Sequence, residues 1–230
     1  MSQSPDASLS RRERERRMRR RAMLDAAQAV FAEKGYADAT LDEIAARAEF
    51  GKGTLYNYFE DGKKGILLAV FDDIIREMET LIHTVFQEER DEDQSLRSAF
   101  HTFVERYFKM IQDQQELFLI LVREAHRMAL SDDPDRSRFF QEQQERLVDA
   151  LTPVLDAAVE DGEIQPLPTD AVANLLLANV RGMGTHCTLQ KRHCPGMDQP
   201  FLDDPEEAAN FLTTLLFDGL AHDSRSAASA

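Results

Sequence analysis

The sequence predicts an all-α protein, and three features of the residue pattern support this fold class. Apolar residues recur every three or four positions along most of the 230 residues, which is the spacing of one face of an α-helix. No segment shows a competing apolar and polar alternation of the kind that marks a half-buried strand. Capping residues and helix breakers divide the pattern into separate helices. The length allows one large domain or two small ones, since domains usually span about 100 to 150 residues.

The N-terminal part begins with a polar segment and one helix. Residues 1–10 are small and polar, and we expect them to form a disordered tail. The helix predicted over residues 11–34 places Leu24 and Phe31 two turns apart on one face. Gly35 follows it at the position where a glycine commonly ends a helix.

Two short helices follow, separated by a turn. Thr40 and Glu43 have the spacing of a capping box, in which each side chain accepts a hydrogen bond from a free backbone N–H of the first turn. This helix is predicted to stop near Ala48, and a turn containing Gly51 leads to a short helix over residues 53–59. Two apolar residues four positions apart in the short helix face inward and leave its polar and tyrosine side chains outward. The arrangement is helix, turn, short helix.

The remainder of the chain is predicted to form longer helices. Apolar residues from Ile66 to Val85 form a continuous stripe with the helical period, so a helix extends to about Glu89 and can join two domains. Asp204 and Pro205 mark the start of the last helix, because proline suits the first helical position. The further helices are predicted over residues 94–112, 115–130, 134–160, 170–190 and 205–221.

Charge is distributed unevenly along the chain. The net charge of −15 by itself argues against a nucleic-acid partner, because phosphate binding depends on Lys and Arg. Residues 1–64 hold 13 Lys and Arg against 11 Asp and Glu, whereas residues 65–230 hold 14 against 31, so the two parts carry +2 and −17. Eight arginines lie between Arg11 and Arg21. Such a run is a solvated arm about as often as a nucleic-acid contact, and it counts as the latter only beside a reading motif.

Targeting features are few. The longest uncharged apolar run, residues 171–180, is far shorter than the roughly 20 residues that span a membrane. The basic N-terminus is not followed by the continuous apolar segment of a secretory signal. Two cysteines are too few for a disulfide framework. We therefore expect a cytoplasmic protein with no membrane partner.

Three short segments carry a resemblance to a known family. They are Phe-Ala-Glu-Lys-Gly-Tyr at 31–36, Thr-Leu-Asp-Glu-Ile-Ala at 40–45 and Gly-Lys-Gly-Thr-Leu-Tyr-Asn-Tyr-Phe at 51–59. Together they resemble the tetracycline-repressor (TetR) family of bacterial regulators, over residues 18–75. The resemblance implies an all-helical homodimer in which three N-terminal helices bind operator DNA and the C-terminal helices hold a small-molecule effector.

The short helix has the residue types that a DNA-reading helix needs. A helix-turn-helix presents its second helix to the major groove, where Lys52 can reach a guanine edge and Gly53 lets the backbone approach closely. The resemblance implies that Thr40 touches a phosphate, and Lys63 or its neighbour Lys64 would pair with another. The tyrosines have an alternative role as packing residues. The predicted DNA-binding residues are Thr40, Lys52, Gly53, Thr54, Tyr56, Asn57, Tyr58 and Lys63.

Two segments depart from the family pattern. Glu49 stands where the family usually has glycine, and Phe50 and Gly51 replace the usual Val-Ser, which predicts a reshaped turn before the reading helix. The link at residues 60–63 is one residue longer and more acidic than usual, and it leaves open which lysine meets the phosphate.

The resemblance also divides the chain by function. It implies a helix-turn-helix DNA-binding domain over residues 11–64 and an effector-binding and dimerisation domain over residues 65–230. Effector cavities are usually apolar with a few polar anchors, although most aromatic residues at helical spacing are simply core. The candidate effector-binding residues are Phe103, Tyr107, Phe118, Arg123, His126 and Phe140.

The last two helices are predicted to form the homodimer interface. The helix over 205–221 has an apolar face too wide for a lone surface helix, and with the helix over 170–190 it would build a four-helix interface across a two-fold axis. The alternative is burial of this face within one subunit. A palindromic operator requires such a dimer.

These features predict a transcriptional regulator, specifically a repressor that a small molecule releases from a palindromic operator. The alternative trigger is thiol or metal chemistry at Cys187 and Cys194, each of which follows a histidine, although their spacing is poor for zinc. No Gly-rich phosphate loop, nucleophile elbow or metal-ligand pair at i, i+4 is present in the sequence. We therefore expect no enzyme activity, catalytic residue, cofactor or bound metal.

Overall fold

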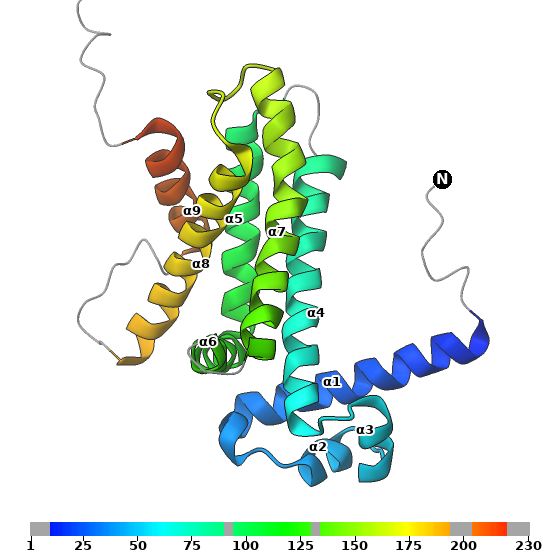
Figure 1. Cartoon of the computed structure of the whole chain (residues 1–230). Helices are drawn as coiled ribbons and strands as arrows, with labels where there is room; N and C mark the ends of the chain where they lie inside the picture. The colour runs from blue at the N-terminus through cyan, green and yellow to red at the C-terminus, as the bar shows by residue number, and fades with distance from the viewer. Residues whose placement is uncertain (1–9, 90–93, 130–133, 194–203, 220–230) are drawn as a thin grey trace, which may run out of the picture. The chain divides into compact units, whose positions relative to one another are not determined.

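The computed structural model describes residues 10–89, 94–129, 134–193 and 204–219, and in these ranges the chain is helical without strands (Figure 1). The predicted all-α fold class is confirmed. The helices are α1 (Arg11–Asp38), α2 (Leu41–Arg47), α3 (Lys52–Tyr58), α4 (Lys63–His83), α5 (Leu96–Asp113), α6 (Gln115–Ala129), α7 (Pro134–Glu160), α8 (Thr169–His193) and α9 (Pro205–Thr213), with single π-helical turns η1 (Thr84–Glu88) and η3 (Thr214–Asp218) after α4 and α9.

Contacts divide the chain into two compact units. The first contains Met1–Ile75 and Glu116–Ser131, and the second contains Arg76–Gln115 and Asp132–Ala230. Helix α6 therefore belongs to the first unit, and α4 is shared between the two. The predicted functional boundary after residue 64 stays a prediction.

The first unit is built around the part of α1 that begins at Met23. Met23, Leu24, Ala27 and Phe31 are fully buried on one face of this helix. The other helices of the unit supply further buried side chains, among them Ile44, Leu55, Ile66 and Leu67. Burying each such aliphatic or aromatic side chain stabilises the fold by roughly 1.5 to 3 kcal/mol. The buried face fixes the orientation of the opposite, exposed faces of α2 and α3.

Helix α1 extends beyond its predicted end near Lys34. Gly35 has a non-helical backbone with φ 77° and ψ 162°, and a last helical turn follows as far as Asp38. A positive φ is accessible to glycine at little cost because it has no Cβ. The regular helix therefore ends where the sequence predicts, and the glycine kink adds one more turn.

Helix α2 begins with the predicted capping box. The backbone N–H of Glu43 donates to the Thr40 hydroxyl at 3.3 Å, and the N–H of Thr40 donates to the Glu43 carboxylate at 3.0 Å. Lys34 forms an ion pair with the same carboxylate. The hydrogen bond from Lys34, followed by those from Thr40, lowers the pKa of Glu43 to about 2, so this cap keeps its charge down to that pH.

The second unit is a helical bundle. Helix α9 packs along α5, and α8 packs along α7. Phe100, Phe103 and Leu147 lie in its core, and the Arg146 guanidinium donates to the Glu79 carboxylate at 2.8 Å to link α7 to α4. The predicted last helix, 205–221, appears as α9 followed by η3 up to Asp218, and residues 220–221 lie outside the described ranges.

Candidate nucleic-acid interface

The turn between α2 and α3 is tight and includes a residue in the left-handed region. The N–H of Phe50 donates to the Ala45 carbonyl at 3.0 Å, and the N–H of Glu49 donates to the Ala46 carbonyl at 3.2 Å. Glu49 has φ 60°, a conformation that costs an L-residue with a Cβ about 1 to 2 kcal/mol. The backbone thus takes the form that a glycine would adopt easily.

Helix α3 has a buried side and an exposed side. Leu55 and the following Phe59 are buried at 1% and 5% exposure and anchor the helix to the first unit. Tyr56 is 46% exposed. Of the other predicted DNA-binding residues, four are exposed, namely Thr40, Lys52, Gly53 and Asn57. The remaining three, Thr54, Tyr58 and Lys63, are half-buried.

An exposed ion pair joins the start of α3 to α2. The Lys52 ammonium group lies 2.9 Å from the Asp42 carboxylate of α2, and this hydrogen bond raises the pKa of Lys52. Both side chains are largely exposed, so solvent screens the pair and Lys52 exchanges Asp42 readily for another anion. Lys52 is therefore held at the start of α3 in its charged form.

The Lys63 side chain forms hydrogen bonds within the protein. Its ammonium group donates to the backbone carbonyls of Tyr36 at 2.8 Å, Ala37 at 3.0 Å and Ala39 at 2.8 Å. It also lies 4.7 Å from the centre of the Tyr36 ring. Lys63 thus joins the start of α4 to the segment between α1 and α2, whereas Lys64 is the adjacent half-buried lysine.

The arginine-rich start of α1 lies beside the end of α3. The guanidinium carbon of Arg16 lies 5.8 Å from the centre of the Tyr58 ring, and that of Arg20 lies 5.5 Å from the centre of the Phe59 ring. Arg20 and Arg21 also approach the buried carboxylate of Asp73 on α4, at 3.9 and 3.6 Å. The arginine run is visible in the sequence, whereas its contact with α3 depends on packing. The four-residue spacing of Arg16 and Arg20 is the local signal of this contact, because it places both side chains on one helix face.

The predicted effector-binding residues fall into separate groups. In the second unit, Phe103 and Tyr107 are buried neighbours on α5 with nearly parallel rings 6.5 Å apart, and Phe140 of α7 is half-buried. In the first unit, Phe118 is half-buried on α6. Arg123 and His126 are exposed on that same helix, where Arg123 approaches Glu124 at 3.5 Å and the His126 ring bonds the Val122 carbonyl at 2.7 Å.

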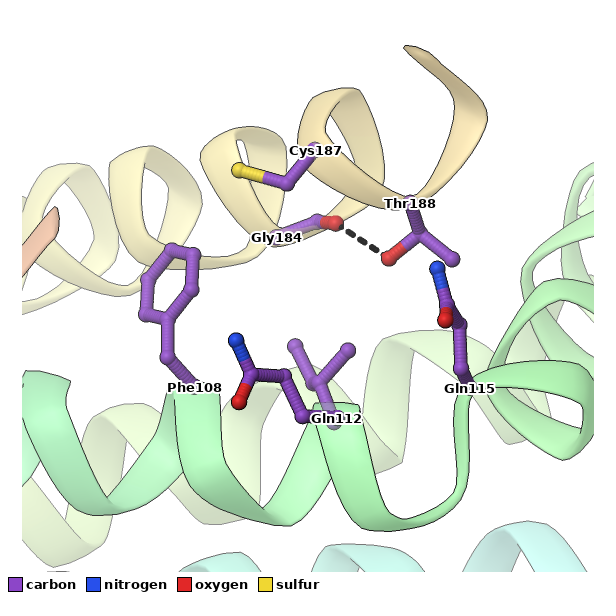
Figure 2. A pocket seen from close by; sticks show the side chains of 7 residues that line it. Phe108, Gln112, Gln115, Gly184, Cys187 and Thr188 are labelled. Atoms are coloured by element: carbon purple, nitrogen blue, oxygen red, sulfur yellow. Dashed lines mark hydrogen bonds between the residues drawn. The ribbon is translucent and has the colours of Figure 1, made fainter. Parts of the chain in front are cut away.

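A small pocket opens between α5 and α8 of the second unit (Figure 2). Its cavity volume is about 10 Å³, room for about one water molecule and far below the roughly 300 to 1,000 Å³ of ligand sites. None of the six predicted effector residues is among those that line it. The lining residues are Phe108, Ile111, Gln112, Gln115, Gly184, Cys187 and Thr188.

Two ionisable groups lie on the helices that form this pocket, the buried Tyr107 of α5 and the half-buried Arg181 of α8. Burial raises the pKa of the Tyr107 hydroxyl well above its usual value, so the hydroxyl is a neutral hydrogen-bonding group at all ordinary pH values. Burial also lowers the pKa of Arg181 on α8, whose charge interacts with Tyr107. A half-buried cation and a phenol thus accompany the apolar lining of this part of the bundle.

The predicted thiol pair is only partly within the described ranges. Cys187 is buried, 7% exposed, and Cys194 lies outside the described residues. Among the residues that the structure describes, no cluster of three or more His, Cys, Asp or Glu side chains could hold a metal ion. In the same ranges, no helix is both long and apolar enough to cross a membrane.

Comparisons with known proteins converge on one family. Residues 23–70 match the model of bacterial regulatory proteins, tetR family. The chain is 22% identical over 159 residues to the uncharacterized HTH-type transcriptional regulator YhgD of Bacillus subtilis, which covers 69% of this chain and 78% of that protein. It is 32% identical over 103 residues to the HTH-type transcriptional activator FasR of Mycolicibacterium smegmatis, and this match spans 45% of each protein, less than half of FasR.

A solved structure shares the fold over most of the chain. It is the transcriptional regulator FadR from Bacillus subtilis in complex with stearoyl-CoA, with a TM-score of 0.70. The match covers 87% of this chain and 99% of that one at 18% sequence identity. At this identity the likeness concerns the fold.

Proposed function

The chain belongs to the tetR family of bacterial regulatory proteins and is a DNA-binding transcriptional regulator; from this premise, we propose that it is a repressor released from a palindromic operator by a small molecule. The observation that carries the DNA-binding part is the exposed side of α3. Leu55 and Phe59 anchor the helix, and Lys52, Tyr56 and Asn57 are presented outward. A helix of this kind fits the major groove, in which base edges can be distinguished.

The individual contacts follow from the chemistry of each exposed group. Lys52 would exchange its exposed Asp42 partner for a guanine edge, at little cost because both side chains are hydrated. Asn57 can pair with adenine, and Tyr56 can contact a base or a phosphate. Thr40 caps α2 and would place its hydroxyl near a phosphate. Lys63 donates to three backbone carbonyls between α1 and α2. We therefore assign to Lys64 the phosphate contact that the sequence left open between these two lysines.

Selection of bound sites from a random DNA pool tests this proposal. We expect an enriched palindrome whose half-sites lie about one helical turn apart, because a two-fold dimer places two reading helices in successive grooves. The variant with Lys52→Ala and Tyr56→Ala should bind that palindrome at least tenfold more weakly and lose preference for it over a scrambled duplex. A Lys109→Ala variant, which removes an exposed lysine from α5, should bind as the wild type does. No enrichment with the wild type would contradict the proposal.

The homodimer is proposed to form mainly through α8. Ala171, Leu175, Ala178, Gly182 and Leu189 follow one another at spacings of four, three, four and seven residues on this helix, and all five are exposed. This is the spacing of a coiled-coil seam, and its small residues allow close approach of a second helix. Leu175 is 64% exposed, which is unusual for a leucine on an otherwise packed helix. A second copy of the chain would cover it.

The effector is proposed to bind the second unit and to have a long apolar chain. The bundle core there is rich in phenylalanine, and the pocket beside Arg181 and Tyr107 supplies an opening with a cation close by. The regulator FadR, whose fold is similar, was solved with stearoyl-CoA. The pocket must widen to hold such a chain, and a ligand that favours the widened state would shift the population away from the DNA-binding form.

Titration of the protein and operator complex with stearoyl-CoA tests the effector class. We expect release of DNA, with free coenzyme A as the matched control that leaves the complex intact. Replacing Arg181 with Met should weaken the response to the acyl compound without changing DNA affinity in its absence. Release by neither acyl-CoA nor free fatty acid would contradict this effector class and leave the DNA-binding proposal standing.

A further inference from the structure

Helix α1 begins well before the part of it that packs into the first unit. Its first buried residue is Met23, so residues 11–22 form an arm of three turns, about 18 Å long. The arm, defined as residues 11–22, carries eight arginines and two glutamates, a net charge of +6. Every residue of the arm except the half-buried Arg20 is exposed. Its start is fixed by a capping box between Ser10 and Glu13.

One face of the arm continues the buried stripe of α1. Arg12, Arg16 and Arg19 precede Met23 by 11, 7 and 4 residues, which places all three on the helix face that Met23 buries. The contact of Arg16 with the Tyr58 ring shows that this face is turned toward the end of α3. This face of α1 is therefore apolar where it packs into the first unit and basic where it lies beside α3.

No ion pair of Arg12, Arg16 or Arg19 is found among the described residues. The ion pairs of the arm's arginines with Asp25 and Asp73 are made at its base, by Arg20 and Arg21. Arg12 and Arg16, four residues apart, are neighbours of like charge on the helix, and such a pair destabilises an isolated helix. A polyanion bound along this face would remove that repulsion and favour the helical arm.

We propose that the arm is a second DNA-binding element, which contacts the phosphate backbone beside the half-site that α3 reads. The proposal rests on the proposed DNA-binding function. Arg12, Arg16 and Arg19 make the contacts, and their ligand is the phosphodiester of duplex DNA without regard to base sequence. The arm is long enough to cover several phosphates, since one strand of duplex DNA carries a phosphate about every 3.4 Å along its axis. The arm adds affinity, and α3 supplies specificity.

The salt dependence of DNA affinity tests this proposal. Each phosphate contact contributes about 0.9 to the slope of log affinity against log salt, so each lost contact weakens binding by up to about eightfold at 0.1 M salt. The variant with Arg12→Gln, Arg16→Gln and Arg19→Gln should show a slope reduced by about 0.9 for each contact removed. Its affinities for the selected palindrome and for a scrambled duplex should fall by the same factor, because phosphates carry no sequence information.

Two further variants separate local contact from overall charge. Replacing the same three arginines with lysine should restore most of the slope, since lysine also neutralises a phosphate. Replacing Arg106, Lys109 and Arg138 of the second unit with glutamine removes the same total charge and should leave the slope unchanged. Glutamine and arginine have similar helix propensities, so circular dichroism should show an intact fold in all of them.

The outcomes distinguish this proposal from the proposed function. A wild type that selects a palindrome, with an unchanged slope in the arm variant, would overturn the arm proposal and leave the reading helix in place. A wild type that selects no site would contradict the proposed function itself. The proposal would also be overturned if the wild type bound phosphatidylserine vesicles and the glutamine variant bound DNA with wild-type affinity. On duplexes trimmed to the two half-sites, we expect the affinities of the wild type and the glutamine variant to converge.

Discussion

The backbone of Glu49 adopts a conformation that a residue with a Cβ disfavours. It has φ 60° in the turn before α3, and the left-handed conformation penalises a Cβ. We predict that Glu49→Gly raises the free energy of unfolding by about 0.5 to 1 kcal/mol, after allowance for the greater freedom of glycine in the unfolded chain. Urea unfolding measures this.

Two controls separate the backbone effect at Glu49 from other causes. Glu49→Ala removes the charge but keeps the Cβ, so it should bring no comparable gain. Ala46→Gly places glycine at an exposed position of α2 and should cost about 1 kcal/mol. Equal stability of the glycine and alanine variants at position 49 would show that the turn stores no backbone strain.

Lys63 is the residue whose role the tertiary structure redefines. A charged donor that bonds three backbone carbonyls leaves those acceptors unpaired when it is removed. We predict that Lys63→Met lowers the free energy of unfolding by about 1.5 to 3 kcal/mol, whereas Lys64→Met changes it by less than about 0.5 kcal/mol. Lys64→Met should instead weaken operator binding. A Lys63→Met protein with normal stability and weak DNA binding would restore the phosphate contact to Lys63.

At the scale of elements, the approach of α5 and α8 depends on one glycine. A Cβ added to Gly184 would lie 2.7 Å from the Ile111 side chain and 3.2 Å from the Tyr107 ring, whereas one added to Gly182 would meet nothing within 4 Å. We predict that Gly184→Ala lowers the free energy of unfolding by about 1 to 3 kcal/mol through overpacking. Gly182→Ala should raise it by up to about 1 kcal/mol, because alanine is the better helix former.

A compensating change tests the cause of this difference. Ile111→Val removes the closest methyl group, so combining it with Gly184→Ala should recover part of the lost stability. Because Gly184 lines the pocket, the alanine variant should also narrow the opening and weaken any response to an effector. If both glycine variants have the same stability, close packing of the two helices is not the reason for glycine at 184.

At the scale of the whole molecule, the exposed seam of α8 requires a partner. We predict that wild-type protein sediments at twice the 26.2 kDa of one chain and that Leu175→Asp shifts it to the monomer, because a charge in an apolar seam loses its hydration. Leu167 provides a matched control, since it is 56% exposed but lies in the loop before α8. Leu167→Asp should remain dimeric. A wild-type mass of 26.2 kDa would contradict the dimer.

Residues 65–230 and the basic arm carry opposite net charges. Residues 65–230 carry a net charge of −17 and repel phosphate, but charges further apart than about 8 Å are largely screened at physiological salt. Under the proposed function, the basic arm therefore acts locally, while residues 65–230 disfavour any orientation that brings them to the duplex. In that proposal charge orients the encounter with DNA, and α3 reads the sequence.

The sequence by itself determined the features that depend on neighbouring residues. Helix order, the capping box of Thr40 and Glu43, the break at Gly35 and the inward positions of Leu55 and Phe59 were all predictable. Each rests on hydrogen bonds or periodicity within a few residues, and these are properties of the local chain. The family motifs lie in the same segments, and for that reason the fold class and family could be assigned from them.

Only the tertiary structure decided the features that join distant segments. Lys63 reaches carbonyls 24 to 27 residues away, Arg16 reaches Tyr58, and Gly184 meets Ile111. No local pattern records these pairs, because they depend on how separate helices pack. The predicted effector residues share this dependence: Phe103 and Tyr107 became buried neighbours, whereas Arg123 and His126 lie on an exposed face of α6. The sequence supplies the side chains, and packing selects which of them meet.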